Sequence, residues 1–296
     1  MNRLLLFISL ITILLITSCE DVIDIDLEEA SGDLVIDAWI DNRNQAQEIR
    51  LTLSQAYFDN QSVSAAGAKV TIINETQQET FIFDETNTDG IYRWSPDSRL
   101  NIGSEGDVLN LNIDFNGVSY TASSTINRVP VIDSIGQEFR DDELFSDDGI
   151  YAQFFARDFE GAGDAYWIKT YKNGEFFANA DQLNIAYDAG FDAGSRIDGL
   201  IFIPPIREFV NDLDEDGLPF PWQVGEEIMV EIHSISIPAF NFLEIARDQI
   251  LNGDNSIFTL PLANARSNIS KSDGGAALGF FNVAQVSSLT DVIVEQ

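Results

Sequence analysis

The feature that most restricts the fold is a run of alternating apolar and polar residues with one Asn-Gly pair in its middle. Apolar side chains occupy every second position of residues 109–115, and again of residues 118–122, on either side of Asn116-Gly117. Such alternation places the apolar side chains on one face of a β-strand. Asn-Gly accepts the positive φ angles of a two-residue type I′ turn. The segment therefore predicts a β-hairpin with one buried face.

Similar short alternations recur through the first half of the chain. They occupy residues 34–40, 49–53, 70–73 and 81–83, and Asp89-Gly90 marks a turn before residues 91–92. Many short strands separated by turns are typical of an antiparallel β-sandwich of the immunoglobulin-like kind. We therefore expect a mainly β protein whose N-terminal domain, residues 33–128, is an antiparallel β-sandwich.

A second unit is expected over residues 129–296. It contains another Asn-Gly hairpin signal at Asn173-Gly174 and further strand patterns. Apolar residues three and four positions apart predict a helix near residues 238–251. Residues 178–226 show little periodicity and are expected to form long loops, of which residues 204–222 are the expected variable surface. The sequence thus predicts a β-rich C-terminal domain with one helix.

The start of the chain has the pattern of a bacterial lipoprotein. Residues 1–18 read as a signal peptide, because Arg3 precedes an apolar run, residues 4–16, that is short for a membrane span. The next residues, Thr17, Ser18 and Cys19, resemble the lipobox, whose cysteine receives lipid. Cys19 is the single cysteine of the chain. We expect cleavage before Cys19 and anchoring of the mature chain by several acyl chains.

An acidic segment follows the lipidation motif. Residues 19–32 are expected to form the lipidated tether, and Glu20 and Asp21 resemble the acidic export signal of Bacteroidota lipoproteins that reach the cell surface. The alternative is a solvated acidic tether without a sorting role, because charge runs are usually solvated.

The charge balance excludes several classes of function. The chain has 16 Lys plus Arg against 49 Asp plus Glu, a net charge of −33. Proteins that bind nucleic acid or anionic membranes through their surface need clustered Lys and Arg. One His and one Cys leave no set of zinc ligands and few groups for acid and base catalysis. We expect a protein without catalytic residues, although abundant carboxylates leave open a hydrolase that uses a carboxylate pair.

One acidic motif has the pattern of a calcium loop. Asp212, Asp214 and Asp216 alternate before Gly217, so their carboxylates could converge on Ca²⁺. The twelfth position holds Gln223 where an EF-hand has Glu, and the alternative is a solvated acidic turn. The only histidine, His233, is expected on the polar face of a strand together with Glu231.

Several short segments, in this order, resemble the DUF4249 family of Bacteroidota outer-membrane lipoproteins, and the N-terminal part resembles transthyretin-like carboxypeptidase regulatory domains. The resemblance is carried by Cys19-Glu20, Val22-Ile23-Asp24-Ile25, Leu34-Val35-Ile36-Asp37, Gly67-Ala68-Lys69-Val70, Asp89-Gly90-Ile91-Tyr92, Tyr166-Trp167, Asn268-Ile269 and Ala277-Leu278-Gly279-Phe280-Phe281.

The resemblance implies an outer-membrane location, facing the cell surface, and a role as accessory or ligand-binding partner of a TonB-dependent transporter. It supplies no catalytic residues. The alternatives are a glycosidase-like surface hydrolase and a structural or adhesion protein of the envelope. No cofactor is expected apart from the calcium ion considered above.

The lipid anchor gives the first testable prediction. Cys19→Ala removes the only thiol that can accept lipid, so labelling with a fatty-acid analogue should disappear and the protein should leave the outer-membrane fraction. Glu20→Ala with Asp21→Ala is the companion variant. It should keep the label, but external protease should no longer reach the protein on intact cells. Label retained by Cys19→Ala would contradict the lipoprotein assignment.

Overall fold

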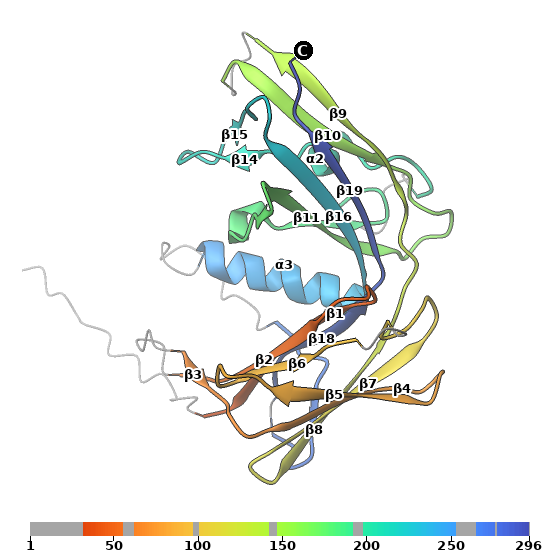
Figure 1. Cartoon of the computed structure of the whole chain (residues 1–296), viewed down its shortest axis with the longest axis vertical. Coiled ribbons are helices and arrows are strands. Elements are labelled where there is room, and N and C mark those ends of the chain that lie inside the picture. The colour runs from red at the N-terminus through yellow and green to blue at the C-terminus, as the bar shows by residue number, and fades with distance from the viewer. Residues whose placement is uncertain are drawn as a thin grey trace, which may run out of the picture.

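The chain folds into two β-rich lobes with a helix between them (Figure 1). The computed structural model describes residues 32–55, 62–96, 101–141, 147–191, 198–252, 265–275 and 277–295. Strands dominate the described residues, and the fold is mainly β and sandwich-like, as the sequence predicts.

The N-terminal lobe is one ten-stranded curled sheet. Its strands follow the order β17-β8-β7-β4-β5-β6-β2-β1-β18, and β3 pairs with β2. The neighbouring pairs are antiparallel except β1 and β18, which run parallel. The strands are β1 (Leu34–Asp41), β2 (Gln47–Leu53), β3 (Val63–Ser64), β4 (Lys69–Asn74), β5 (Glu79–Glu85), β6 (Ile91–Trp94), β7 (Val108–Phe115), β8 (Val118–Thr125), β17 (Ser270–Lys271) and β18 (Leu278–Ala284).

The predicted hairpin is present as β7 and β8. Phe115 pairs with Val118 across the turn, and Asn116 and Gly117 have φ angles of 49° and 82°. These positive values are the conformation that a type I′ turn needs. Asn173 and Gly174 repeat it, at 51° and 83°, between the first two strands of the other lobe's sheet. Both Asn-Gly predictions are confirmed.

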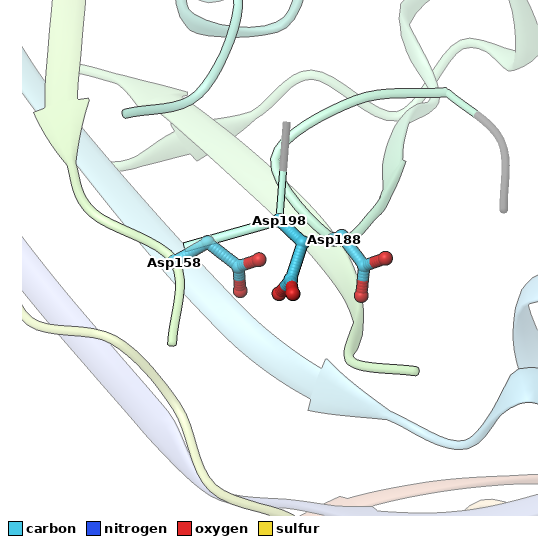
Figure 2. A group of neighbouring side chains, drawn as sticks. All are labelled: Asp158, Asp188 and Asp198. Carbon is cyan, nitrogen blue, oxygen red and sulfur yellow. The ribbon is translucent and has the colours of Figure 1, made fainter. Parts of the chain in front are cut away.

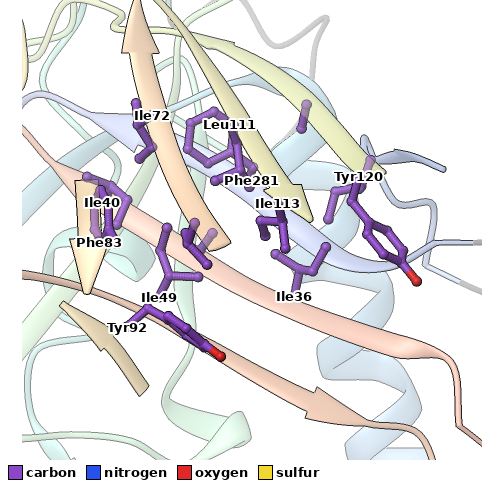
Figure 3. Packing of buried hydrophobic residues seen from close by; sticks show 14 of the residues in the cluster. Ile36, Ile40, Ile49, Ile72, Phe83, Tyr92, Leu111, Ile113, Tyr120 and Phe281 are labelled. Carbon is purple, nitrogen blue, oxygen red and sulfur yellow. The ribbon is translucent and has the colours of Figure 1, made fainter. Parts of the chain in front are cut away.

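The curled sheet encloses an apolar core (Figure 3). Ile36 and Ile49 come from one half of the sheet, and Ile72 and Leu111 from the other. The two halves also meet through a hydrogen bond in which the Val283 amide of β18 donates to the Ser124 hydroxyl of β8 at 3.0 Å. Each strand contributes alternate side chains, so the period of two in the sequence is the pattern that fills this core.

The C-terminal lobe consists of a five-stranded sheet, a two-stranded ribbon, a short hairpin and two short helical turns. The sheet order is β12-β11-β16-β19, with β13 also paired to β11. Its elements are β9 (Ile132–Arg140) and β10 (Gly149–Ala156) in the ribbon, β11 (Ala165–Lys172), β12 (Glu175–Phe176), β13 (Asn184–Tyr187), β16 (Glu227–Ile235) and β19 (Val286–Val292) in the sheet, β14 (Asp212–Leu213) and β15 (Pro219–Phe220) in the hairpin, and the helical turns η1 (Ala180–Gln182) and α2 (Pro204–Arg207).

Helix α3 (Ile237–Asn252) confirms the helix predicted near residues 238–251 and lies between the lobes (Figure 1). Its residues Ala239, Phe240 and Leu243 are buried in a small third core. The aromatic rings of both lobes meet there, because Trp39 of β1 stacks on Phe280 at 5.5 Å and contacts Trp167 of β11 edge-on at 5.4 Å. The helix and these rings join the two lobes.

The structure differs from the expected division at residue 128. Strands β17 and β18 lie beyond that residue, yet they pair with β8 and β1 of the N-terminal sheet. The chain then passes directly into β19 of the C-terminal sheet. The pairing of residues about 240 positions apart leaves no local pattern, which is why the sequence suggested a simple boundary.

The contact between β1 and β18 predicts an unusually costly glycine substitution. Gly279 has a φ of +92°, and a Cβ atom there would lie 1.9 Å from the carbonyl oxygen of Ile36. Gly279→Ala should therefore lower the free energy of unfolding by at least about 3 kcal/mol, from strain and backbone collision together. Gly117→Ala is the matched control, because Gly117 also has a positive φ but open space around it, and should cost about 1 kcal/mol. Equal urea midpoints for the two variants would contradict this assignment.

Candidate functional site

The predicted residues of the N-terminus, Cys19, Glu20 and Asp21, lie outside the described residues, so the lipid anchor and the export signal stay predictions. Within the described residues, no helix has the length and apolar character needed to cross a membrane.

The predicted calcium loop is the tip of the β14–β15 hairpin. Asp214 Oδ1 accepts hydrogen bonds from the amides of Asp216 and Leu218, each at 2.9 Å, and so closes the turn. Asp212 Oδ1 accepts from the side chain of Gln182 at 2.7 Å. Among the described residues, the one group of three carboxylates close enough to share an ion lies elsewhere. Asp212 and Asp214 thus accept hydrogen bonds from backbone amides of the hairpin itself. The calcium site at Asp212, Asp214 and Asp216 remains a prediction.

A network of buried charges lies where β1 meets the C-terminal sheet. Glu231 and His233 share one face of β16, as predicted, but they are only 1% and 5% exposed. Arg43, just after β1, donates to Glu231 and also, at 2.7 Å, to Asp41. His233 Nε2 lies 2.8 Å from a Glu231 oxygen, and the Tyr171 hydroxyl donates to the same oxygen at 3.2 Å. The expected polar face is therefore an interface between the lobes.

The environment of this network lowers the pKa values of Glu231, His233 and the neighbouring Lys169 below those of free side chains. Burial alone would raise the pKa of Glu231, but the hydrogen bond from His233 and the charge of Arg43 lower it to about 2. Burial, helped by the positive charge of Lys169, lowers the pKa of His233 to about 4. Since a carboxylate only accepts, the proton of the neutral imidazole must sit on Nε2. Burial also lowers the pKa of Lys169 to about 8.

The buried network of Arg43, Glu231 and His233 has a structural role at the interface between the lobes. His233 is enclosed and held by Glu231, so its imidazole faces protein rather than a cavity open to a substrate. Breaking a buried ion pair leaves an uncompensated charge and is strongly destabilising. The sequence did not reveal this network, because Arg43 and Glu231 are 188 residues apart and alternation on β16 cannot tell a solvated polar face from a covered one.

Two hollows of the surface flank residues 176–179, which run from the end of β12 to the residue before η1. On one side lies a polar hollow of about 460 Å³, reaching from Lys172 to Asp212. On the other side lies an apolar hollow of about 390 Å³, reaching to Leu243 and Ile250 of α3. Phe176, Phe177, Ala178 and Asn179 line both. We call the two hollows together the Phe176 cleft.

Contacts with neighbouring side chains hold the aromatic rings that line the Phe176 cleft. The ammonium of Lys169 lies 4.0 Å from the ring centre of Trp167 and 5.9 Å from that of Phe176. Phe177 stacks on Trp222 at 6.2 Å. Cation–π and ring contacts of this kind fix side chains that would otherwise move. The cleft thus has a rigid apolar wall beside polar groups, which is the usual composition of a binding site.

The structure refines the expected variable surface at residues 204–222. Ile206, Val210 and Trp222 from this stretch are buried in the core of the C-terminal lobe. The Asp212 side of the stretch borders the Phe176 cleft. The aromatic and apolar residues of an irregular segment can be core as easily as surface, and sequence periodicity cannot distinguish the two when strands are only two residues long.

A comparison with known families identifies the family of the chain. The model of a domain of unknown function, DUF4249, matches residues 20–290. The chain belongs to the DUF4249 family. No curated protein matches it. The DUF4249 match covers both lobes, α3 and the Phe176 cleft, so these parts together are the family's domain.

The single histidine of this DUF4249 protein gives a pH prediction. The pKa of His233 is lower when folded than its ordinary value of 6.5, so below pH 6.5 the unfolded chain binds more protons and the free energy of unfolding falls as pH falls. The loss is complete below pH 4 and amounts to about 2 kcal/mol between pH 7 and pH 5.

The variant His233→Gln isolates this effect, because glutamine can donate to Glu231 but does not titrate. Urea unfolding of both proteins at several pH values should show their difference in stability shrinking as the pH falls. Parallel profiles would mean that His233 does not titrate with a lowered pKa.

Proposed function

We propose that this chain is a non-catalytic binding protein, held by lipid on Cys19 to the outer membrane, facing the cell surface and serving as an accessory of a TonB-dependent transporter. The Phe176 cleft is its binding site. The lipobox-like sequence before Cys19 and the acidic residues Glu20 and Asp21 support the location. The transporter partnership rests on what the sequence resemblance implies.

The single observation that carries the binding role is the Phe176 cleft. An apolar hollow beside a polar one suits a ligand or protein segment with an apolar group next to a polar one. The exposed Ile250 at the rim extends the apolar surface beyond the hollow. The walls stand on the five-stranded sheet and α3, so the site is preformed, and a preformed site loses little entropy on binding.

The charge of the chain favours a partner with basic groups opposite the cleft. A net charge of −33 attracts cationic surfaces over the Debye length, about 8 Å at physiological ionic strength. Lys172 in the polar hollow is already neutralised by Glu226, at 2.9 Å. Asp212 and Glu175 line the same hollow and remain available for a basic group of the partner.

The test is co-purification of the intact, tagged lipoprotein from detergent-solubilised outer membranes. Ala178→Arg places a long side chain where both hollows meet, and it should weaken recovery of a transporter barrel about tenfold, equivalent to about 1.4 kcal/mol. Val131→Arg is the matched control: Val131 is 73% exposed and lines neither hollow. Recovery should also fall as salt rises.

Two results would contradict the proposal. Equal recovery with Ala178→Arg and with Val131→Arg would remove the cleft from partner binding. Turnover of a glycan or peptide by the purified protein, lost when one carboxylate is neutralised, would make the chain a hydrolase. Deletion of residues 204–222 is not a usable test, because it removes core side chains.

A further inference from the structure

Three aspartates from separate segments of the C-terminal lobe come together beside β11. Asp158 follows β10, Asp188 follows β13, and Asp198 precedes the bridge residue Ile201. One carboxylate oxygen from each lies within 4.8 Å of the other two. Figure 2 shows the three carboxylates side by side, with Asp198 between Asp158 and Asp188. We call these residues the aspartate triad.

The burial of the aspartate triad distinguishes it from an ordinary acidic surface. Asp158 and Asp188 are each 3% exposed, whereas Asp198 is exposed and opens the triad to solvent. Two buried carboxylates and a third at their mouth repel one another at short range in a medium of low dielectric constant. Charged groups in such a place are normally paired or bind a metal.

An unsatisfied oxygen gives the second and independent observation. Asp158 Oδ1 accepts a hydrogen bond from the Tyr166 hydroxyl at 2.6 Å. Asp158 Oδ2 is buried and has no hydrogen-bond partner among the described residues. A buried carboxylate oxygen without a donor is costly, so the atom favours a ligand beyond the groups that the described residues supply.

The backbone holds the other two aspartates so that each keeps an oxygen for a ligand. Asp188 has a positive φ of 49°, and its Oδ1 accepts from the amides of Gly163 and Asp164 at 2.8 and 3.0 Å. Asp198 Oδ2 accepts from the Gly161 amide at 3.2 Å. The loop of residues 157–164 is thus wrapped around the triad, and Arg128 keeps the neighbouring Asp164 engaged through Nε at 3.0 Å.

We propose that the aspartate triad binds a single Ca²⁺ ion. All three ligands are hard carboxylate oxygens, which Ca²⁺ prefers, and no nitrogen or sulfur ligand belongs to the group. Ligand atoms up to 4.8 Å apart fit around one ion with Ca–O distances of about 2.4 Å, whereas Mg²⁺ requires about 2.1 Å and a near-ideal octahedron. The ion neutralises the triad, satisfies Asp158 Oδ2, and ties the loop after β10 to the segments after β13 and before Ile201.

The experiment uses the full chain, purified in detergent and stripped with chelator, then titrated with CaCl₂ by calorimetry and followed by thermal unfolding. One binding event is expected, and Ca²⁺ at a hundredfold excess over its dissociation constant should raise the melting temperature by about 5 °C. Asp198→Asn changes an exposed side chain, so the fold is kept, and it should weaken Ca²⁺ binding at least about tenfold.

Asp214→Asn with Asp216→Asn is the matched control, because it removes two of the three alternating carboxylates of the β14–β15 hairpin, the other acidic candidate, and should leave the Ca²⁺ affinity unchanged. Terbium luminescence gives a readout that stability alone would not move. Tb³⁺ at the triad lies close to Tyr166 and should emit on tyrosine excitation in the control but not in Asp198→Asn.

Three outcomes would overturn the proposal. These are identical melting in calcium and in chelator with no heat of binding, loss of Ca²⁺ binding in the hairpin variant but not in Asp198→Asn, and tighter binding of Mg²⁺ than of Ca²⁺. None of them affects the Phe176 cleft, whose variants are scored by co-purification.

Discussion

The parallel pairing of β1 with β18 is the contact on which the rest of the molecule depends. It brings a strand from the end of the chain into the N-terminal sheet, next to the first described strand. The same chain then continues as β19 into the C-terminal sheet, so the two lobes share a backbone crossing as well as an interface. The approach is so close that position 279 admits only hydrogen as a side chain. With β18 in place, α3 has a surface on which to pack, because Phe280 lies in its core.

The interface between the lobes combines aromatic rings with buried charges. Trp39 and Trp167 provide apolar contact, and Arg43, Glu231 and His233 provide a directional polar contact beside it. Buried ion networks contribute little net stability, since the cost of removing charges from water offsets their attraction. Their geometry, however, favours one relative placement of the lobes, because a shifted lobe would break the ion pair between Arg43 and Glu231. This gives the single histidine of the chain a structural position.

Both proposed binding regions lie on connections of the C-terminal lobe, and both depend on this frame. The Phe176 cleft lies between the β12–η1 connection and α3, and α3 is held by the lobe interface. The aspartate triad, by contrast, is formed by loops: the segments after β10 and after β13 meet there beside Tyr166. An ion there would hold irregular segments together, whereas contacts between aromatic rings hold the residues of the Phe176 cleft. Loops on a rigid β scaffold are the usual location of binding residues, and fold alone would not identify them.

The sequence by itself determined the class of the fold, both Asn-Gly hairpins and helix α3, because these follow from local periodicity and from turn residues that accept positive φ. It also determined the family, through the order of short segments along the chain. The acidic run at Asp212 was visible for the same local reason, whereas the aspartate triad was not, since its members are far apart in sequence. Only the tertiary structure decided that β18 returns to β1, that Glu231 and His233 are covered, and that residues 206 and 222 are core. Each of these depends on which strands pair across more than a hundred residues or on what packs over a given face, and neither is encoded in the period of a single strand.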